Sequence, residues 1–204
     1  MRKLYLNPSS IVVPGEYELG DLNTLKLYHR IFDSGYSDIV PPSIVVGVDR
    51  VKRHDRFKEE LESKLRFIEK GRWLDELKRH KINQIMIQDG RLMEKFEEVA
   101  RDAHFYLIDG NHRSVAATLT NQKVPALQLE RDEDLVRVKE MVERGELFEF
   151  NQDGNTVDGL IHDFEEHCLN LSNIDYVTTV EERVRRLVKE GLLPRYITNK
   201  YKGN

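Results

Sequence analysis

One short stretch constrains the fold of this chain more than any other: an apolar run, a polar turn containing glycine and a helix-prone segment follow one another without a break. Phe105–Ile108 is aromatic and branched, which is typical of a strand covered on both faces. Val115 and Leu119 are four residues apart and predict a helix after the turn. Because Val124–Leu129 predicts another strand, the stretch indicates a strand, helix, strand unit in a mixed sheet.

The turn between this strand and this helix combines side chains suited to holding an anion. Its residues are Asp109, Gly110, Asn111, His112 and Arg113. Gly110 permits a sharp bend after the strand, where the N–H groups at the start of the next helix point outward. Arg113 offers a fixed positive fork suited to phosphate, and His112 can donate a hydrogen bond or a proton. We therefore expect the centre of a ligand site or active site here, with phosphate held along Gly110–Ser114.

The same turn also fits a purely structural role. Asp109 or Asn111 would then cap the helix, and Arg113 would pair with a surface carboxylate. In a functional site Asp109 would instead orient one of the neighbouring side chains or hold a metal ion. The residues alone leave both roles open, and they do not identify a metal.

The N-terminal part predicts further elements of the same sheet. Leu4–Val13 reads as one extended segment interrupted by a turn or bulge, and we expect it to be the first strand. Asp21 can cap a helix whose apolar residues recur at helical spacing as far as Phe32. Pro42 prevents a helix and precedes Ile44–Val48, which predicts a short apolar strand.

The composition becomes strongly charged and helix-prone between residues 51 and 103, which indicates a helical insertion. Phe57, Leu61 and Ile68 fall on one helical face, and Gly71 is a candidate break. Ile82–Ile87 is compatible with either a strand or a helix. We therefore divide the chain into a domain of residues 1–130 that contains this insertion, and a C-terminal extension of residues 131–204 packed on it.

The C-terminal extension is expected to be helical throughout. Apolar residues recur at helical spacing on both sides of Gly145. Thr178 and Glu181 have the spacing of a capping box for a helix over Val180–Lys189. Cys168 is the only cysteine, so an intrachain disulfide is excluded, and we expect a buried thiol on a helix face.

Charge and hydropathy narrow the function classes. The formal net charge is −4, so no overall positive field draws the chain to nucleic acid or to an anionic membrane. No run approaches the roughly 18 apolar residues of a membrane span, and the first ten residues lack the apolar core of a signal peptide. We expect a cytoplasmic protein without a membrane partner, and nucleic acid is not the favoured partner.

Residues 4–48 and 104–130 resemble the ParB/sulfiredoxin-like superfamily. The resemblance is carried by the apolar strand, the Asp-Gly-Asn-His-Arg turn, an alanine-bearing helix and the following Val124–Ala126. Members of that superfamily share a Gly-x-(His/Arg)-Arg turn at the corresponding place. The resemblance implies an α+β fold with a mixed sheet, and the helical insertion and the helical C-terminal region lie outside it.

Single positions separate the branches of that superfamily. Sulfiredoxins place a reactive cysteine directly before the His-Arg pair, where this chain has Asn111. Chromosome-partitioning ParB proteins have Gly-Glu-Arg-Arg and a helix-turn-helix domain, whereas this chain has Asn111-His112 and an acidic balance. The free-serine kinases have Asp-Gly-His-His-Arg and an acidic base in a Pro-x-Glu context. Their turn is more similar, and Pro14-Gly15-Glu16 matches that context.

The resemblance implies a nucleotide-binding enzyme that transfers or hydrolyses a phosphoryl group, for example a small-molecule kinase. Glu16 would take a proton from the attacking hydroxyl, and His112 and Asp109 are the other candidate catalytic residues. ATP, ADP or CTP and Mg²⁺ would be the cofactors, and a small molecule would be the substrate. Glu18 and Asp21 are alternatives to Glu16, and the phosphoryl acceptor stays open.

Two other functions remain compatible with the residues. The first is a ParB-like DNA-binding or regulatory module without catalysis, for which the Arg183–Lys189 segment supplies basic side chains. A basic face or a helix-turn-helix within residues 131–190 would distinguish it. The second is a ligand-sensing protein that has kept the fold and lost the chemistry.

Overall fold

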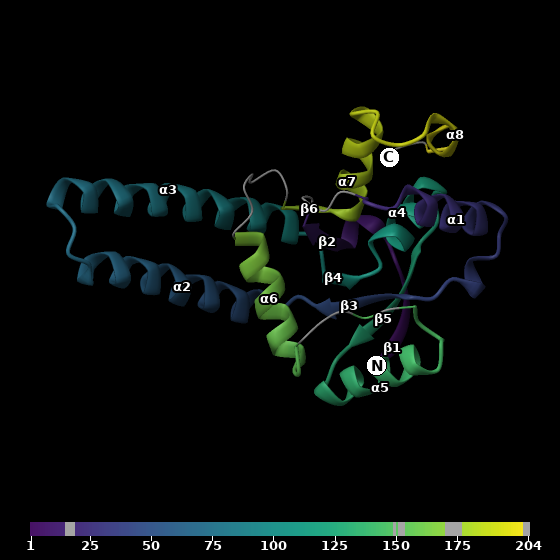
Figure 1. Cartoon of the computed structure of the whole chain (residues 1–204), viewed down its shortest axis with the longest axis horizontal. Coiled ribbons are helices and arrows are strands. Elements are labelled where there is room, and N and C mark those ends of the chain that lie inside the picture. The colour runs from purple at the N-terminus through teal and green to yellow at the C-terminus, as the bar shows by residue number, and fades with distance from the viewer. Residues whose placement is uncertain (15–18, 149, 151–153, 170–176, 202–204) are drawn as a thin grey trace.

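The computed structural model describes residues 1–14, 19–148, 150, 154–169 and 177–201. These residues form a mixed six-stranded sheet with helices on both faces, and a long helical hairpin projects from one side of it (Figure 1). The α+β class expected from the sequence is thereby confirmed. Within the described ranges, no helix is both long enough and apolar enough to cross a membrane.

The sheet brings together strands from both ends of the chain. Its order is β1 (Arg2–Leu6), β5 (Val124–Leu129), β3 (Ser43–Gly47), β4 (Phe105–Asp109), β2 (Ile11–Pro14) and β6 (Val177–Thr179). The β4 strand runs antiparallel to β3 and parallel to β2. The β5 strand runs parallel to β3 and antiparallel to β1. The mixed sheet predicted around Phe105–Leu129 is therefore present, with β4 in its interior.

Two hydrophobic cores cover the two faces of the sheet. The helices packed on one face are α1 (Leu22–Asp33), α4 (Asn111–Leu119) and α7 (Val180–Lys189). Those on the other face are α5 (Asp132–Glu143), α6 (Val157–Leu169) and the bases of α2 (Arg50–Lys70) and α3 (Asp75–Ala100). In β4, Tyr106 belongs to the second core and Leu107 to the first. The expectation that this strand is covered on both faces is confirmed.

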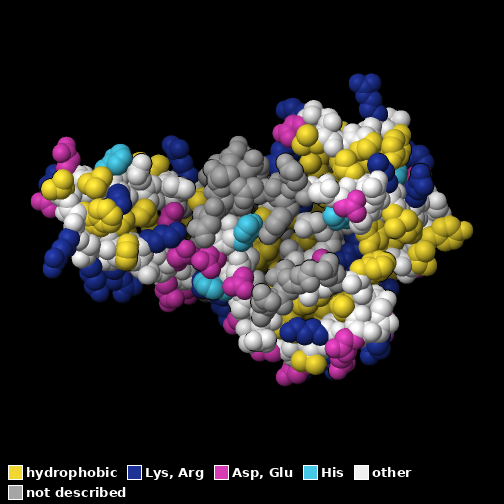
Figure 2. Space-filling view, in the orientation of Figure 1, with side chains coloured by type: hydrophobic (Ala, Val, Ile, Leu, Met, Phe, Trp, Pro, Cys, Tyr) yellow, Lys and Arg dark blue, Asp and Glu magenta, His cyan; other side chains and the backbone are white. Residues whose placement is uncertain are grey.

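The hairpin of α2 and α3 is the expected helical insertion. The α2 helix ends at Lys70, directly before Gly71, and Ile82–Ile87 is helical within α3. Its base is anchored by aromatic contacts: Phe96 lies edge-on to Tyr106, with ring centroids 5.9 Å apart. Exposed apolar side chains gather toward the tip of the hairpin (Figure 2), and among them are Phe67, Trp73, Leu74 and Leu77.

Three expectations about the ends of the chain need correction. Leu4–Val13 forms two strands, β1 and β2, which lie at different places in the sheet and are joined by a 3-10 turn at Pro8–Ser10. The extension after residue 131 is not purely helical, because β6 pairs with β2. The capping box of α7 consists of Thr179 and Glu182, one residue later than predicted. The remaining short elements are a 3-10 turn at Ser37–Ile39 and α8 (Arg195–Thr198).

Candidate functional site

Gly110 forms the bend between β4 and α4, and only glycine fits there. Its φ is +108°, a conformation that other L residues rarely adopt. A Cβ atom on Gly110 would also lie 2.9 Å from the Cα atom of Ser43 on the neighbouring strand. The close approach and the positive φ together fix the direction in which α4 leaves the sheet.

No described side chain caps the N-terminus of α4. Gly110 is the N-cap residue, and no hydrogen bond from a described side chain satisfies the first turn. The predicted cap by Asp109 or Asn111 is therefore wrong, whereas the other part of that structural role, the pairing of Arg113 with a carboxylate, is present. The first N–H groups of a helix have no partner within it and carry a partial positive charge. An uncapped N-terminus consequently offers N–H donors to an anion.

Arg113 is buried under the turn, and its guanidinium group is already hydrogen-bonded within the protein. The sequence instead predicts a guanidinium group open to phosphate. The residue is only 6% exposed. Its Nη1 donates to the carbonyl oxygen of Pro42 at 2.9 Å and to that of Pro41 at 3.3 Å. Its Nη2 pairs with the Asp109 carboxylate within the same turn. The guanidinium group thus ties the turn to the segment before β3, and it does not line the cleft described below.

Asn111 is oriented by a residue that the sequence did not connect with the turn. The Nη1 of Arg183 on α7 donates to Asn111 Oδ1 at 2.7 Å. Arg183 is 1% exposed, so its positive charge is buried directly behind the start of α4. A buried guanidinium group next to an uncapped helix N-terminus makes this end of α4 favourable for negative charge.

His112 is half-buried, and this burial favours its neutral form. Burial lowers its pKa, and the partly opposing influence of the Asp21 carboxylate does not restore it. Its Nε2 atom is buried without a hydrogen-bond partner among the described residues. Ser114 is also turned inward, because its hydroxyl donates to the carbonyl oxygen of Asn111 at 2.9 Å. Neither side chain lines the cleft in front of the turn.

A cleft of about 400 Å³ opens in front of the turn. Its lining residues are Pro14, Leu107, Ile108, Asp109, Asn111, Leu160, Asp163, Phe164 and His167. The end of β4 and the start of α4 therefore form one wall, and α6 forms the other. Of the predicted site residues that are described, Asp109 and Asn111 face the cleft. Glu16 lies outside the described residues, and Pro14, two residues before it, is part of the lining.

Asp163 and His167 belong to the cleft although the sequence did not identify them as site residues. They lie four residues apart on α6 and share a face with Leu160 and Phe164. That spacing was visible in the sequence, but nothing there showed that this face of α6 looks toward the turn.

The described residues do not include a group of three or more histidine, cysteine or acidic side chains placed to hold a metal ion. Cys168 is fully buried, as expected, and burial raises the pKa of its thiol. A reactive cysteine is therefore absent from the part of the chain that the structure describes.

The features that would favour a DNA-binding module are weak. Arg183 is buried, and Arg185 pairs with Glu181 at 2.6 Å, so the basic residues of α7 do not form one open face. A helix-turn-helix joins its helices through three or four residues. Among the described helices of residues 131–190, α5 ends at Glu143 and α6 begins at Val157, while β6 stands between α6 and α7.

Comparisons of this chain with family models, with curated proteins and with solved structures find no match. What the site can do is therefore inferred from the residues of the turn and of the cleft.

Proposed function

We propose that this chain has the ParB/sulfiredoxin-like fold and binds a nucleoside di- or triphosphate in front of the turn. The observation that carries the proposal is the N-terminus of α4, which no described side chain caps and whose first residue, Asn111, lines the cleft. The cleft has the size of small-molecule sites, which usually occupy about 300–1,000 Å³. A strand, a glycine bend and a helix N-terminus form a recurrent arrangement for phosphate binding.

In this proposal backbone groups bind the phosphate, and the side chains of Arg183 and Arg113 position those groups without contacting it. The N–H groups of the first turn of α4 donate to the phosphate oxygens. The buried charge of Arg183 attracts the phosphate through Asn111, whose side chain it orients. Arg113 contributes by holding the turn in place, which replaces the direct phosphate contact expected from the sequence.

Two carboxylates of the cleft, Asp163 and Asp109 through the oxygen that is not paired with Arg113, fit a magnesium ion that accompanies the phosphates. Mg²⁺ keeps several water ligands and is usually bound by one or two carboxylates together with phosphate oxygens. Asp163 is exposed at the cleft, and Asp109 lies on the opposite wall. These two carboxylates would hold the ion, which would neutralise charge on the transferred phosphoryl group. A closed metal site made only of protein groups is not required.

The reaction that we propose is phosphoryl transfer to a small molecule, or to water. Its demands are mainly positioning and neutralisation of phosphate charge, which the turn supplies. Glu16 remains the proposed base that takes the proton from the attacking hydroxyl. Pro14 lines the cleft, and Glu16 is two residues after it in the sequence. Burial lowers the pKa of His112, and its side chain does not line the cleft, so Glu16 and not His112 is the proposed base.

The test is calorimetric titration with ATP, ADP and CTP in the presence of Mg²⁺, on the wild type and on Asn111→Asp. An Asp side chain has the same shape, still accepts a hydrogen bond from Arg183, and stabilises a helix N-terminus by about 0.3–1 kcal/mol. Its negative charge repels phosphate, so we expect affinity to fall by at least about tenfold, or roughly 1.4 kcal/mol.

The matched control is Asn83→Asp, the same change at an exposed position of α3. It should leave nucleotide affinity unchanged. If none of the three nucleotides binds the wild type, or if Asn111→Asp binds them as tightly as the control, phosphate is not held at this helix. Release of inorganic phosphate from a bound triphosphate would show transfer to water, whereas transfer to a small molecule would show as conversion of the triphosphate to the diphosphate only when the acceptor is present.

A further inference from the structure

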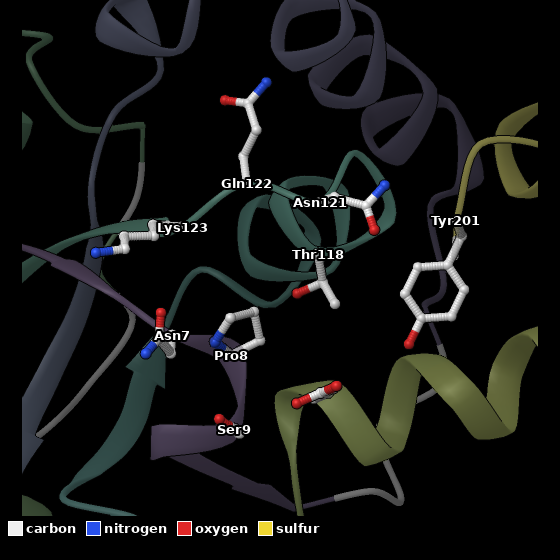
Figure 3. A pocket seen from close by; sticks show the side chains of 9 residues that line it. Asn7, Pro8, Ser9, Thr118, Asn121, Gln122, Lys123 and Tyr201 are labelled. Atoms are coloured by element: carbon white, nitrogen blue, oxygen red, sulfur yellow. The ribbon is translucent and has the colours of Figure 1, made fainter. Parts of the chain in front are cut away.

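A second pocket lies at the opposite end of α4 from the turn, and its volume is about 580 Å³ (Figure 3). Its walls come from the connection between β1 and β2 at Asn7–Ser9, from the end of α4 and the following turn, and from two C-terminal residues, Glu181 and Tyr201. It shares no lining residue with the cleft in front of the turn. The pocket is therefore a separate candidate site.

Six of the nine lining residues of this pocket carry an amide or a hydroxyl group, whereas ligand pockets are usually lined mainly by apolar side chains. Pro8 is the one lining residue without a polar side-chain atom. A polar surface that binds a ligand must exchange its water for hydrogen bonds to that ligand, since a group left unpaired costs about 1–3 kcal/mol. A ligand with several hydrogen-bonding groups therefore matches this lining better than a purely apolar one.

The contacts already made by the lining residues show which atoms are left for a ligand. Asn121 donates from Nδ2 to the carbonyl oxygen of Lys200 at 3.0 Å, and its oxygen is turned toward the space between Thr118 and Tyr201 (Figure 3). Thr118 donates its hydroxyl proton to the carbonyl oxygen of Ser114 at 2.8 Å, which leaves the oxygen as an acceptor. Thr118 and Asn121 therefore present acceptors to groups that donate.

The charges around the pocket do not favour an ion. Glu181 is the acidic residue of the lining, and its carboxylate is paired with Arg185 at 2.6 Å. Lys123 is exposed, and its side chain extends away from the Tyr201 side of the pocket (Figure 3). A neutral donor-rich ligand avoids the desolvation cost that an unpaired charge would carry here.

Two rings in the lining offer flat surfaces against which a ligand can pack. The ring of Tyr201 forms one wall and the ring of Pro8 another (Figure 3). An aromatic ring packs well against an apolar C–H face, and nearby oxygens accept from hydroxyl groups. We propose that this pocket binds a neutral polyhydroxylated molecule of the size of a mono- or disaccharide.

The experiment is ligand-observed NMR on the full chain with D-ribose, D-glucose and sucrose, each at millimolar concentration. Cyclohexanol serves as the comparison ligand, because it has a similar ring and a single hydroxyl group. We expect at least one of the sugars to bind and cyclohexanol not to bind. If no sugar binds, or if cyclohexanol binds as well as the sugars do, the proposal is wrong.

Two variants of lining residues test whether the sugar binds in this pocket. Asn121 has a φ of +55°, so Asn121→Gly keeps an allowed backbone while removing the amide. Ser9→Ala removes one exposed hydroxyl of the lining. Asn155→Gly, at an exposed position outside the pocket, is the matched control. We expect sugar affinity to fall about tenfold in Asn121→Gly and severalfold in Ser9→Ala, and to be unchanged in Asn155→Gly. Unchanged affinity in both pocket variants would overturn the assignment.

Discussion

Replacing Arg113 with methionine tests whether this residue stabilises the turn or binds phosphate directly. Methionine keeps an unbranched side chain that suits a helix, but it cannot donate to Pro41, Pro42 or Asp109. A hydrogen bond to a charged group contributes about 1.5–3 kcal/mol, and breaking a buried ion pair costs about 3–5 kcal/mol. The Asp109 carboxylate is 33% exposed, so water recovers part of that cost. We expect the free energy of unfolding to fall by about 3 kcal/mol.

The assay is urea unfolding followed by circular dichroism, without any nucleotide. The control is Arg79→Met, at an exposed position of α3, which should change the free energy of unfolding by less than about 0.5 kcal/mol. A double-mutant cycle with Asp109→Asn isolates the ion pair, and we expect a coupling of about 1–2 kcal/mol. If Arg113→Met is as neutral as the control, the guanidinium group does not stabilise the turn, and the direct phosphate contact becomes the better account.

Two further predictions concern buried polar groups on either side of the sheet. Glu165 is buried and accepts from Arg56 Nε at 2.8 Å and from the Tyr106 hydroxyl at 2.9 Å. Glu165→Ala should therefore lower the free energy of unfolding in urea by about 3 kcal/mol. Glu166→Ala, a change at the exposed neighbouring residue, should leave it nearly unchanged. Burial lowers the pKa of both His112 and His29, so the unfolded chain binds more protons than the folded one. Their contribution to stability is complete above about pH 6.5 and is lost as the pH falls below it. Unfolding free energies at about pH 7 and pH 5.5 should therefore differ less in a His29→Asn/His112→Asn variant than in the wild type, and an equal difference would contradict the assignment.

Much of the fold follows from local patterns in the sequence. Phe105–Leu119 contains its own strand, bend and helix signals, and the structure requires the glycine for the reason that the sequence suggests. Gly71 ends one long helix, and Asp21 accepts from the N–H of Asn23 as an N-cap should. These features depend on residues close together in the chain, and sequence reasoning can identify them.

What the sequence could not show depends on residues that are far apart in it. The β6 strand is only three residues long, and it is a strand because β2 lies beside it. Arg183 reaches Asn111 from 72 residues away, and no local pattern connects them. Arg113 donates to the carbonyl oxygens of Pro41 and Pro42, which are 72 and 71 residues away in the sequence, so no local pattern predicts these bonds either. The residues of the turn were therefore easier to identify than the directions in which their side chains point.

The most direct test of the phosphate site is an amide proton–nitrogen NMR titration of the full chain with ADP and Mg²⁺. N–H groups that begin to donate to phosphate change their chemical environment strongly. We expect the largest shifts at the amides of Asn111, His112 and Arg113, with smaller ones at the α6 face that carries Asp163 and His167. Shifts that leave the first turn of α4 unaffected, or no shifts at all, would contradict the proposed phosphate site.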